Sequence, residues 1–333
     1  MSNREIKTVA LVGTGVIGAG WAARLVNKGI NVIATDLDAS CEGRLRAVVD
    51  HAQRQLDKLI AVAPDKRGSL SFTTDFDAAV KQADFVQENA PDRVDLKRDL
   101  IQKISKQCGE DVIIASSSSN LRPTEIQAAA VNPGRVIIGH PFNPVYLCPI
   151  VELVMGEQTT QETFDQAKKF YTEMGMRPLH VKKEVDGYIG NRLQEAMWRE
   201  ILYMVRDGVA TPKDIDDAII YGFGIRLAFM GTCLTFHLGG GPGGMTHLLD
   251  HFGPTLKDPL SYLIGPDLTP ELRAAMIDGV EEETDGKSVE ELEAIRDDCM
   301  IEIMRALSKV DYASGKVLNE EKARLRAKGL LAE

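Results

Sequence analysis

Short apolar runs alternate with stretches of helical periodicity over the first half of the chain. Runs of this length, separated by helices, are typical of strands in a parallel sheet. The alternation predicts an α/β fold of the Rossmann type, with a doubly wound and mostly parallel sheet. The expected strands are 9–12, 32–35, 85–87, 112–115, 136–138, 151–154 and 179–181.

The strand pattern stops near Gly187, and signals for helix starts replace it. Thr211 and Thr269 each precede a proline, an arrangement that favours a helix N-terminus. Ser288 and Glu291 have the spacing of a capping box, and the helix they open is expected to run to about Ala313. The sequence therefore predicts a Rossmann domain over residues 1–185 and an all-helical domain over 186–333. The glycines within 239–244 are interpreted as a turn, because no strand precedes them.

The first strand ends in a glycine motif, and the segment from Val9 to Trp21 reads VALVGTGVIGAGW. G-x-G-x-x-G after a strand is typical of dinucleotide binding: the first glycine permits a tight turn, the second lets backbone approach a pyrophosphate, and the third lets the helix pack closely. The pyrophosphate is expected at the N-terminus of the following helix. The cofactor-binding residues of this turn are Gly13, Thr14, Gly15, Val16, Ile17 and Gly18.

Asp36 ends the second expected strand, 18 residues after Gly18. An acid at about this distance binds a ribose 2′-hydroxyl in NAD-dependent proteins. Asp38 follows, and neither Arg nor Lys stands nearby to hold a 2′-phosphate, so the sequence favours NAD over NADP. A simpler interpretation, in which Asp36 caps a helix, stays open but does not explain the glycines.

Composition limits the other function classes. The 333 residues are 44% hydrophobic, which is enough for two domains, and the net charge of −10 argues against nucleic-acid or anionic-membrane partners. The five cysteines contain no C-x-x-C pair, so no metal site or disulfide framework is expected. The longest apolar segment, 223–238, is interrupted by Arg226 and His237, and the start MSNREIK does not resemble a signal peptide. We expect a cytoplasmic protein.

Candidate catalytic residues follow the later strands. Ser119 ends a serine run after strand 112–115, His140 follows the next strand, Glu152 lies in strand 150–154, and Asn191 opens helix 191–206. A histidine beside a buried carboxylate forms a general acid/base pair. Each residue also has a structural interpretation: a core histidine, a plain loop, a solvent-facing edge glutamate and a helix cap.

Together these segments resemble the 3-hydroxyacyl-CoA dehydrogenase family. The resemblance spans both domains and implies that His140 and Glu152 form the catalytic dyad. Ser119 and Asn191 would hold the substrate oxygen and the imidazole, Lys97 would lie near the cofactor and Asn143 beside the nicotinamide. It also implies a homodimer formed through the helical domain. The matching motifs are GTGVIG at 13–18, the serines at 116–119, GHPFNPV at 139–145, VELV at 151–154 and GYIGNRL at 187–193.

Within the family, the segments 195–211 and 223–241 are similar to the branch that oxidises free L-carnitine, with a gulonate-oxidising branch as a near relative. Region 41–70 is shorter and poorer in lysine than the arm typical of members that use CoA esters. The resemblance thus implies NAD-dependent oxidation of the 3-hydroxyl of L-carnitine. Alternatives are gulonate, 3-hydroxybutyrate or its CoA ester, and a non-catalytic NAD-binding protein, which would have no reason to keep the four catalytic residues together.

A trimethylammonium group requires aromatic faces, because it cannot donate a conventional hydrogen bond. Phe142 and Tyr188 are the expected substrate-binding aromatics, since both stand beside the catalytic segments. For Trp198 and Phe236, burial in the core is an equally good interpretation.

Overall fold

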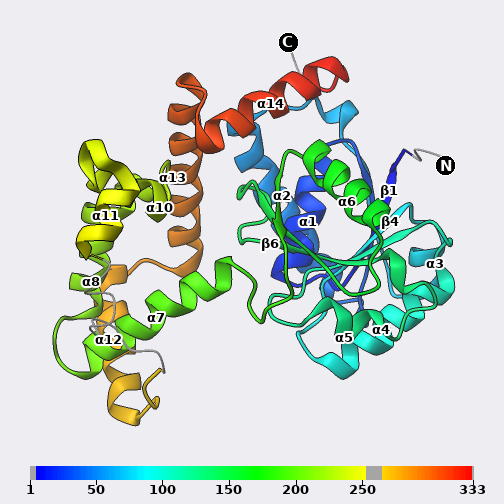
Figure 1. The fold of residues 1–333 in the computed structure, drawn as a ribbon. Helices are drawn as coiled ribbons and strands as arrows, with labels where there is room; N and C mark the ends of the chain where they lie inside the picture. Colours follow the sequence, from blue (N-terminus) through cyan, green and yellow to red (C-terminus); the bar gives the residue numbers. More distant parts are fainter. Residues whose placement is uncertain (1–4, 253–264, 332–333) are drawn as a thin grey trace.

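An eight-stranded sheet forms the centre of the first domain (Figure 1). The computed structural model describes residues 5–252 and 265–331, and the remaining residues of the expected helical domain lie outside that description. The strand order is β3-β2-β1-β4-β5-β6-β7-β8; all neighbours are parallel except β6 and β7, which confirms the doubly wound, mostly parallel sheet. The strands are β1 (Thr8–Val12), β2 (Asn31–Thr35), β3 (Leu70–Thr73), β4 (Phe85–Glu88), β5 (Ile113–Ser116), β6 (Val136–Pro141), β7 (Ile150–Met155) and β8 (Arg177–Val181).

Helices cover both faces of the sheet, as alternate residues of β1 show. Val9 and Leu11 belong to the core shared with α1 (Val16–Asn27), α2 (Cys41–Leu59) and α6 (Gln161–Glu173). Ala10 and Val12 join the core shared with α3 (Phe76–Lys81) and α4 (Val94–Gln107), and α5 (Pro123–Gln127) follows β5. Short 3-10 turns lie at Pro64–Lys66 and Pro133–Arg135.

Strand β3 was not among the expected strands. It has four residues, lies at the edge of the sheet and buries none of its side chains fully. Such a short, half-exposed edge strand has too weak an apolar pattern to stand out in the sequence, and pairing with β2 defines it instead.

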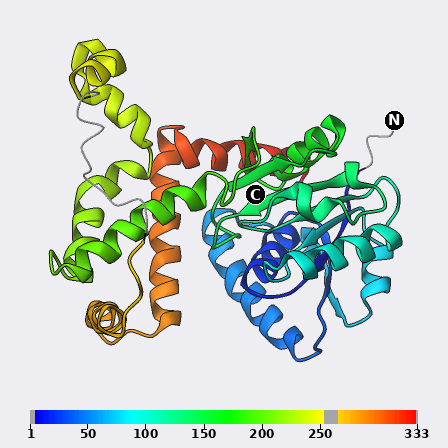
Figure 2. The ribbon, with the colours of Figure 1, turned by 60° about the horizontal axis from the view of Figure 1, so that its bottom comes forward.

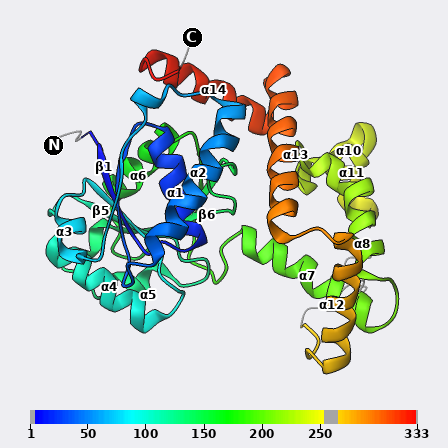
Figure 3. The same cartoon turned by 180° about the vertical axis from the view of Figure 1, so that it is seen from behind.

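Helices make up the second half of the chain (Figures 1 and 3). Val205, Ile215 and Leu272 form its own small core. Thr211, Thr269 and Ser288 each cap the helix that follows, which confirms the expected starts. The helices are α7 (Gly190–Arg206), α8 (Pro212–Ala218), α9 (Gly224–Leu227), α10 (Thr232–Gly239), α11 (Gly244–Phe252), α12 (Pro270–Thr284), α13 (Val289–Lys309) and α14 (Ala313–Ala327), with a π turn at Ile219–Phe223 and a 3-10 turn at Gly241–Gly243.

The expected length of the helix opened by Ser288 was wrong. Helix α13 ends at Lys309, and a new helix, α14, starts at Ala313. Asp311 has a φ of 50°, a left-handed conformation that ends the helix and lets the chain turn back.

The last two helices return to the sheet domain, so the C-terminal half is not a separate body throughout. Ile301 and Met304 of α13, with Leu318 and Leu325 of α14, join the core cluster of α1 and α2. Figure 2 shows α13 standing between the other helices and the sheet domain.

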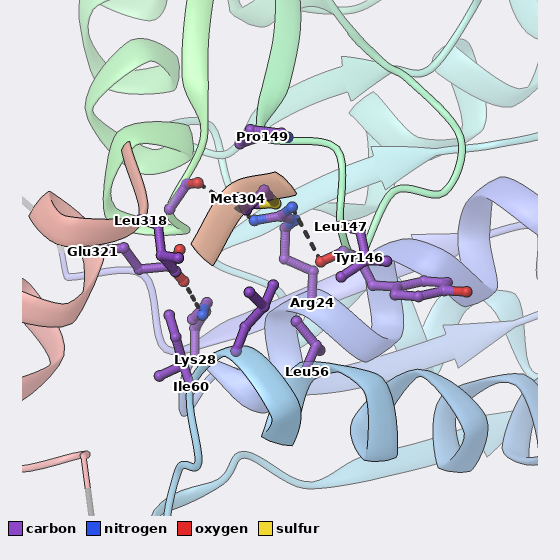
Figure 4. A pocket seen from close by; sticks show the side chains of 12 residues that line it. Arg24, Lys28, Leu56, Ile60, Tyr146, Leu147, Pro149, Met304, Leu318 and Glu321 are labelled. Atoms are coloured by element: carbon purple, nitrogen blue, oxygen red, sulfur yellow. Dashed lines mark hydrogen bonds and ion pairs between the residues drawn. The ribbon is translucent and has the colours of Figure 1, made fainter. Parts of the chain in front are cut away.

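A buried ion pair also joins α14 to α1. The Lys28 ammonium contacts the Glu321 carboxylate in a small pocket that Arg24 also lines (Figure 4). Burial lowers the pKa of Lys28 well below its usual value, and the charges of Arg24 and Arg324 lower it further. The Arg24 guanidinium donates to backbone carbonyls, among them Val145 at 2.7 Å and Tyr146 at 3.2 Å, and so holds the loop after β6.

A second polar contact joins α13 to the same loop. The Asp297 carboxylate is fully buried and accepts a hydrogen bond of 2.5 Å from the Tyr146 hydroxyl. His51 of α2 lies 3.3 Å from the same oxygen, and Arg296 donates to the other oxygen at 2.8 Å. Asp297 therefore ties α2, α13 and the loop after β6 together.

Within the described residues, no single helix has the length and apolar composition needed to cross a membrane. One pair of helical segments, Pro212–Leu227 and Thr232–Gly239, meets these criteria jointly but is bent by 87° at the break.

The Asp297 contact predicts a measurable contribution to stability. Tyr146→Phe should lower the free energy of unfolding by about 1–3 kcal/mol, because it removes a hydrogen bond to a buried carboxylate. Urea denaturation followed by circular dichroism measures the change. Tyr312→Phe is the control, since Tyr312 is 46% exposed; equal stability of the two variants would contradict the prediction.

Candidate active site

His140 and Glu152 face each other across the one antiparallel pair of strands. They are register partners in β6 and β7, and His140 Nδ1 lies 2.9 Å from Glu152 Oε2. His140 is 6% exposed and Glu152 is fully buried. Because β7 runs opposite to β6, the start of β7 lies beside the end of β6. The carboxyl ends of the parallel strands lie at the same edge of the sheet.

The Glu152 carboxylate is held in its ionised form. Burial raises its pKa, but the hydrogen bond from His140 and those from the backbone N–H groups of Gly190 and Ile189 outweigh burial, so the pKa lies below its usual value. An ionised Glu152 accepts from Nδ1–H, which leaves the lone pair of the imidazole on Nε2. No described residue bonds Nε2. The dyad is therefore arranged as a general base with one free nitrogen.

Glu152 also fixes the start of helix α7. Its second oxygen, Oε1, accepts hydrogen bonds of 3.0 Å from Ile189 and from Gly190. These N–H groups belong to the unpaired first turn of a helix, where a negative charge is favourable. One buried carboxylate thus orients the histidine and anchors the helix that carries Asn191.

Ser119 and Asn191 meet beside this dyad. Asn191 Nδ2 donates to the Ser119 carbonyl oxygen at 2.9 Å. The Ser119 hydroxyl and N–H donate to Asp92 Oδ2 at 2.8 and 2.9 Å. Burial raises the pKa of Asp92, but the Ser119 bonds and the Lys97 charge outweigh it, so this carboxyl too stays ionised.

The other serines of the run have structural partners. Ser116 Oγ donates to Glu88 at 2.5 Å, Ser117 Oγ donates to Asn89 at 2.7 Å, and Ser118 Oγ accepts from Leu121 N at 3.0 Å. Ser119 is half-buried, and its carbonyl oxygen is the one that accepts the hydrogen bond from Asn191 of α7.

Lys97 is fully buried and pairs with Glu88. Its Nζ lies 2.8 Å from Glu88 Oε2 and donates to the Ala90 carbonyl at 2.8 Å. Sequence reasoning missed both Glu88 and Asp92. The acidic segment Glu88-Asn-Ala-Pro-Asp92 was the available signal, because it begins at the last residue of β4, at the same sheet edge as the serines.

The glycine turn has the shape that NAD requires. Gly13 has a φ of +93°, and a Cβ at Gly18 would lie 2.1 Å from the Gly13 carbonyl oxygen, so the helix and the turn touch. A Cβ at Gly15 would meet nothing within 4 Å, so open space lies in front of the turn. Because the first-turn N–H groups of α1 start here, at Val16 and Ile17, the turn can receive a pyrophosphate.

Asp36 lies against this turn. Its Oδ2 accepts from the N–H and the hydroxyl of Thr14, both at 2.8 Å, and its Oδ1 accepts from Leu37 N. The Asp36 carboxylate does not cap helix α2, because Ser40 occupies the N-cap position of that helix. It is therefore placed where a ribose hydroxyl would add a further donor.

The two expected substrate-binding aromatics differ in position. Phe142 is half-buried, its ring centre lies 5.3 Å from that of His140, and a Cβ at Gly190 would collide with it at 2.0 Å. Tyr188 is 1% exposed, and its hydroxyl donates to the Leu121 carbonyl at 2.5 Å. A ring so enclosed does not face a ligand, so Tyr188 does not fit the expected role and supports His140 from 5.6 Å instead.

Asn143 lies exposed in the loop after β6, among residues that Arg24 and Asp297 hold in place. Across the described ranges, no group of three or more His, Cys, Asp or Glu side chains could hold a metal ion.

Comparisons with known proteins agree with this arrangement. Residues 8–185 match the family model of the 3-hydroxyacyl-CoA dehydrogenase NAD-binding domain, and residues 187–265 match that of the C-terminal domain. The chain is 47% identical to an L-carnitine dehydrogenase from a Pseudomonas species over 316 residues, which is 95% of this chain and 98% of that protein. It is 47% identical to that of Nocardiopsis dassonvillei over 92% of this chain and 94% of that protein.

Solved structures show the same fold. An NAD-dependent 5-formyl-3-hydroxy-2-methylpyridine 4-carboxylic acid 5-dehydrogenase superposes with a TM-score of 0.76 at 28% identity, covering 91% of this chain and 99% of that one. A (S)-3-hydroxybutyryl-CoA dehydrogenase from Ralstonia eutropha superposes with a TM-score of 0.58 at 27% identity, covering 85% and 95%.

The two roles of Glu152 can be separated by substitution. Glu152→Gln keeps an oxygen for the N–H groups of α7 but removes the anion that stabilises protonated His140. The variant should reduce the rate of oxidation, because the imidazolium that forms in the reaction loses its stabilising anion, and should keep most of the stability of the native fold. Initial rates of NADH formation and urea denaturation measure the two effects.

Glu152→Ala serves as the comparison, since it removes both contacts and should also lower the free energy of unfolding. A rate in Glu152→Gln equal to that of the wild type, with chemistry rate-limiting, would contradict the assignment of Glu152 as the partner of His140.

Asp36 predicts the cofactor preference. Asp36→Ser should weaken NAD binding about 10- to 100-fold, because it removes a charged hydrogen-bond partner, and should reduce discrimination against NADP. Kd values for NADH and NADPH from fluorescence titration test this. Asp38→Ser is the control, because the Asp38 carboxylate bonds Ser40 and not the glycine turn. Equal binding of the two cofactors by the wild type would refute the argument.

Proposed function

The chain belongs to the 3-hydroxyacyl-CoA dehydrogenase family, and we propose that it oxidises the 3-hydroxyl of L-carnitine to 3-dehydrocarnitine with NAD. The observation that carries the chemistry is the buried His140–Glu152 pair, which lies at the end of β6, on the edge of the sheet where β1 ends in the glycine turn, and whose Nε2 bonds no described residue. The substrate follows from similarity to L-carnitine dehydrogenases along nearly the whole chain.

His140 acts as the base of the oxidation. Its Nε2 takes the proton of the substrate hydroxyl while the C–H bond at C3 breaks and a ketone forms; NAD, when bound, accepts the hydride. Glu152 stabilises the imidazolium that results, because the two groups are 2.9 Å apart and shielded from water. In the reverse direction the same imidazolium returns the proton.

Ser119 and Asn191 position the substrate oxygen in this proposal. The Asn191 amide fixes the Ser119 backbone, and Asp92 orients the Ser119 hydroxyl. A hydroxyl and an amide held by neighbours in this way need little reorganisation as charge develops on the oxygen. We place Lys97 in a supporting role, since its ammonium is fully engaged with Glu88 and Ala90.

A homodimer in the cytoplasm is part of the proposal. The helical region exposes many large apolar side chains, which favours a contact with another protein surface. Burying them against a second copy would give the extensive apolar interface of an obligate dimer. All five cysteines are unpaired, as in a reducing compartment. Among the exposed side chains are Ile220 (54%), Tyr221 (76%), Phe236 (50%), Leu238 (60%) and Leu249 (51%).

The proposal predicts a substrate preference. Absorbance at 340 nm should show NADH formation with L-carnitine. kcat/KM should be at least about 10-fold lower for D-carnitine, which inverts the configuration at C3, and for gulonate, 3-hydroxybutyrate and its CoA ester, which lack the trimethylammonium group. Faster turnover of one of the others would replace the substrate assignment and leave the chemistry standing.

His140→Ala is the matched control for the chemistry. This substitution should reduce kcat about 100- to 10,000-fold, which is the usual contribution of a general base to the rate. It should leave the Kd for NADH nearly unchanged. Unaltered turnover in this variant would refute the dyad.

A further inference from the structure

Phe142 is the one of the two expected aromatics that the structure leaves available to the substrate's cation. L-carnitine carries a trimethylammonium group on the carbon next to the reacting one. Such a group is bound by aromatic faces and carboxylates, because it has no N–H to donate. Tyr188 is enclosed in the core, and Phe142 packs one part of its ring on Gly190.

We propose that Glu195 and Trp198 of α7 form the subsite for this cation, a proposal that rests on the assignment of carnitine as substrate. The reference point is Asn191, whose amide bonds Ser119 and so fixes which side of α7 faces the reacting oxygen. At about 100° per residue, Glu195 lies about 40° to one side of Asn191 and Trp198 about 20° to the other. The three side chains share one face of the helix.

The spacing along α7 fits the substrate. The hydroxyl oxygen and the quaternary nitrogen of carnitine are separated by three covalent bonds, or roughly 3–4 Å. One helical turn, from Asn191 to Glu195, advances about 6 Å, and Trp198 lies about 5 Å further. With the oxygen beside Asn191, the methyl groups of the cation therefore lie within reach of the next turn.

Both side chains are available to a ligand in the chain as described. The Glu195 carboxylate is exposed and has no hydrogen bond or ion pair within the described residues, although Arg192 and Arg199 stand at pairing distances along the helix. Trp198 is 46% exposed, which excludes the core position considered for it. Further along the same helix, Val205 is buried in the helical core, so the exposed side chains of α7 lie on the turns nearest the active site. Figure 3 shows this part of α7 crossing from the sheet domain to the other helices.

The test compares a charged and a neutral substrate. Full-length wild type and the Glu195→Gln variant are assayed with L-carnitine and with its analogue in which a tert-butyl group replaces trimethylammonium. Glu195→Gln should lower kcat/KM for carnitine about 10- to 100-fold, mostly through KM, and change that for the neutral analogue less than about 3-fold. Tetramethylammonium, as a competitive inhibitor, should lose affinity in parallel.

Trp198 is tested by a pair of variants. Trp198→Leu should raise KM for carnitine about 3- to 30-fold, and Trp198→Phe should restore part of the loss, because phenylalanine keeps an aromatic face. Glu281→Gln is the control for net charge, since Glu281 is an exposed acid on α12; it should leave both kcat/KM values unchanged.

Three outcomes would overturn the subsite. The first is an unchanged KM for carnitine in Glu195→Gln. The second is an equal loss with the charged and neutral substrates, accompanied by dissociation in light scattering, which would assign Glu195 to a contact with a second copy of the chain. The third is a wild type that does not oxidise carnitine, which would overturn the proposed function together with the subsite; carnitine turnover that is insensitive to Glu195 would overturn the subsite alone.

Discussion

The arrangement of the site depends on the hydrogen bonds of one buried carboxylate. Glu152 binds His140 through one oxygen and the N–H groups of Ile189 and Gly190 through the other. A buried charge with donors on both of its oxygens is stable, and removing either set of donors would leave one oxygen unsatisfied. The orientation of the His140 imidazole and the starting point of α7 are therefore coupled through a single side chain.

The C-terminal helices fix the other side of the site. Asp297 of α13 binds Tyr146, six residues after His140, while Glu321 of α14 pairs with Lys28, which directly follows α1. Arg24 of the same helix, α1, holds the carbonyl groups of the loop after β6. The end of the chain thus contributes to the position of the loop that carries Phe142 and Asn143, although it adds no residue to the dyad.

Much of the fold and site follows from the sequence alone, because the responsible patterns are local. The glycines from Gly13 to Gly18 have a φ and close contacts that only glycine allows, and the caps at Thr211 and Ser288 act within one helical turn. Local signals of this kind are complete within a few residues. The pairing of His140 with Glu152 was also within reach, because both follow from a family pattern as well as from strand ends.

Tertiary structure decided the rest, since the remaining contacts join distant segments. Tyr188 has the same local pattern as a ligand-facing aromatic, but packing encloses it in the core. Asp92 acquires its role only when the ends of β4 and β5 bring it to Ser119, and edge strand β3 exists through pairing with β2. Periodicity gives the type of an element, whereas burial and partner choice depend on which elements meet across the fold. The bond between Asp297 of α13 and Tyr146 of the loop after β6 is an example.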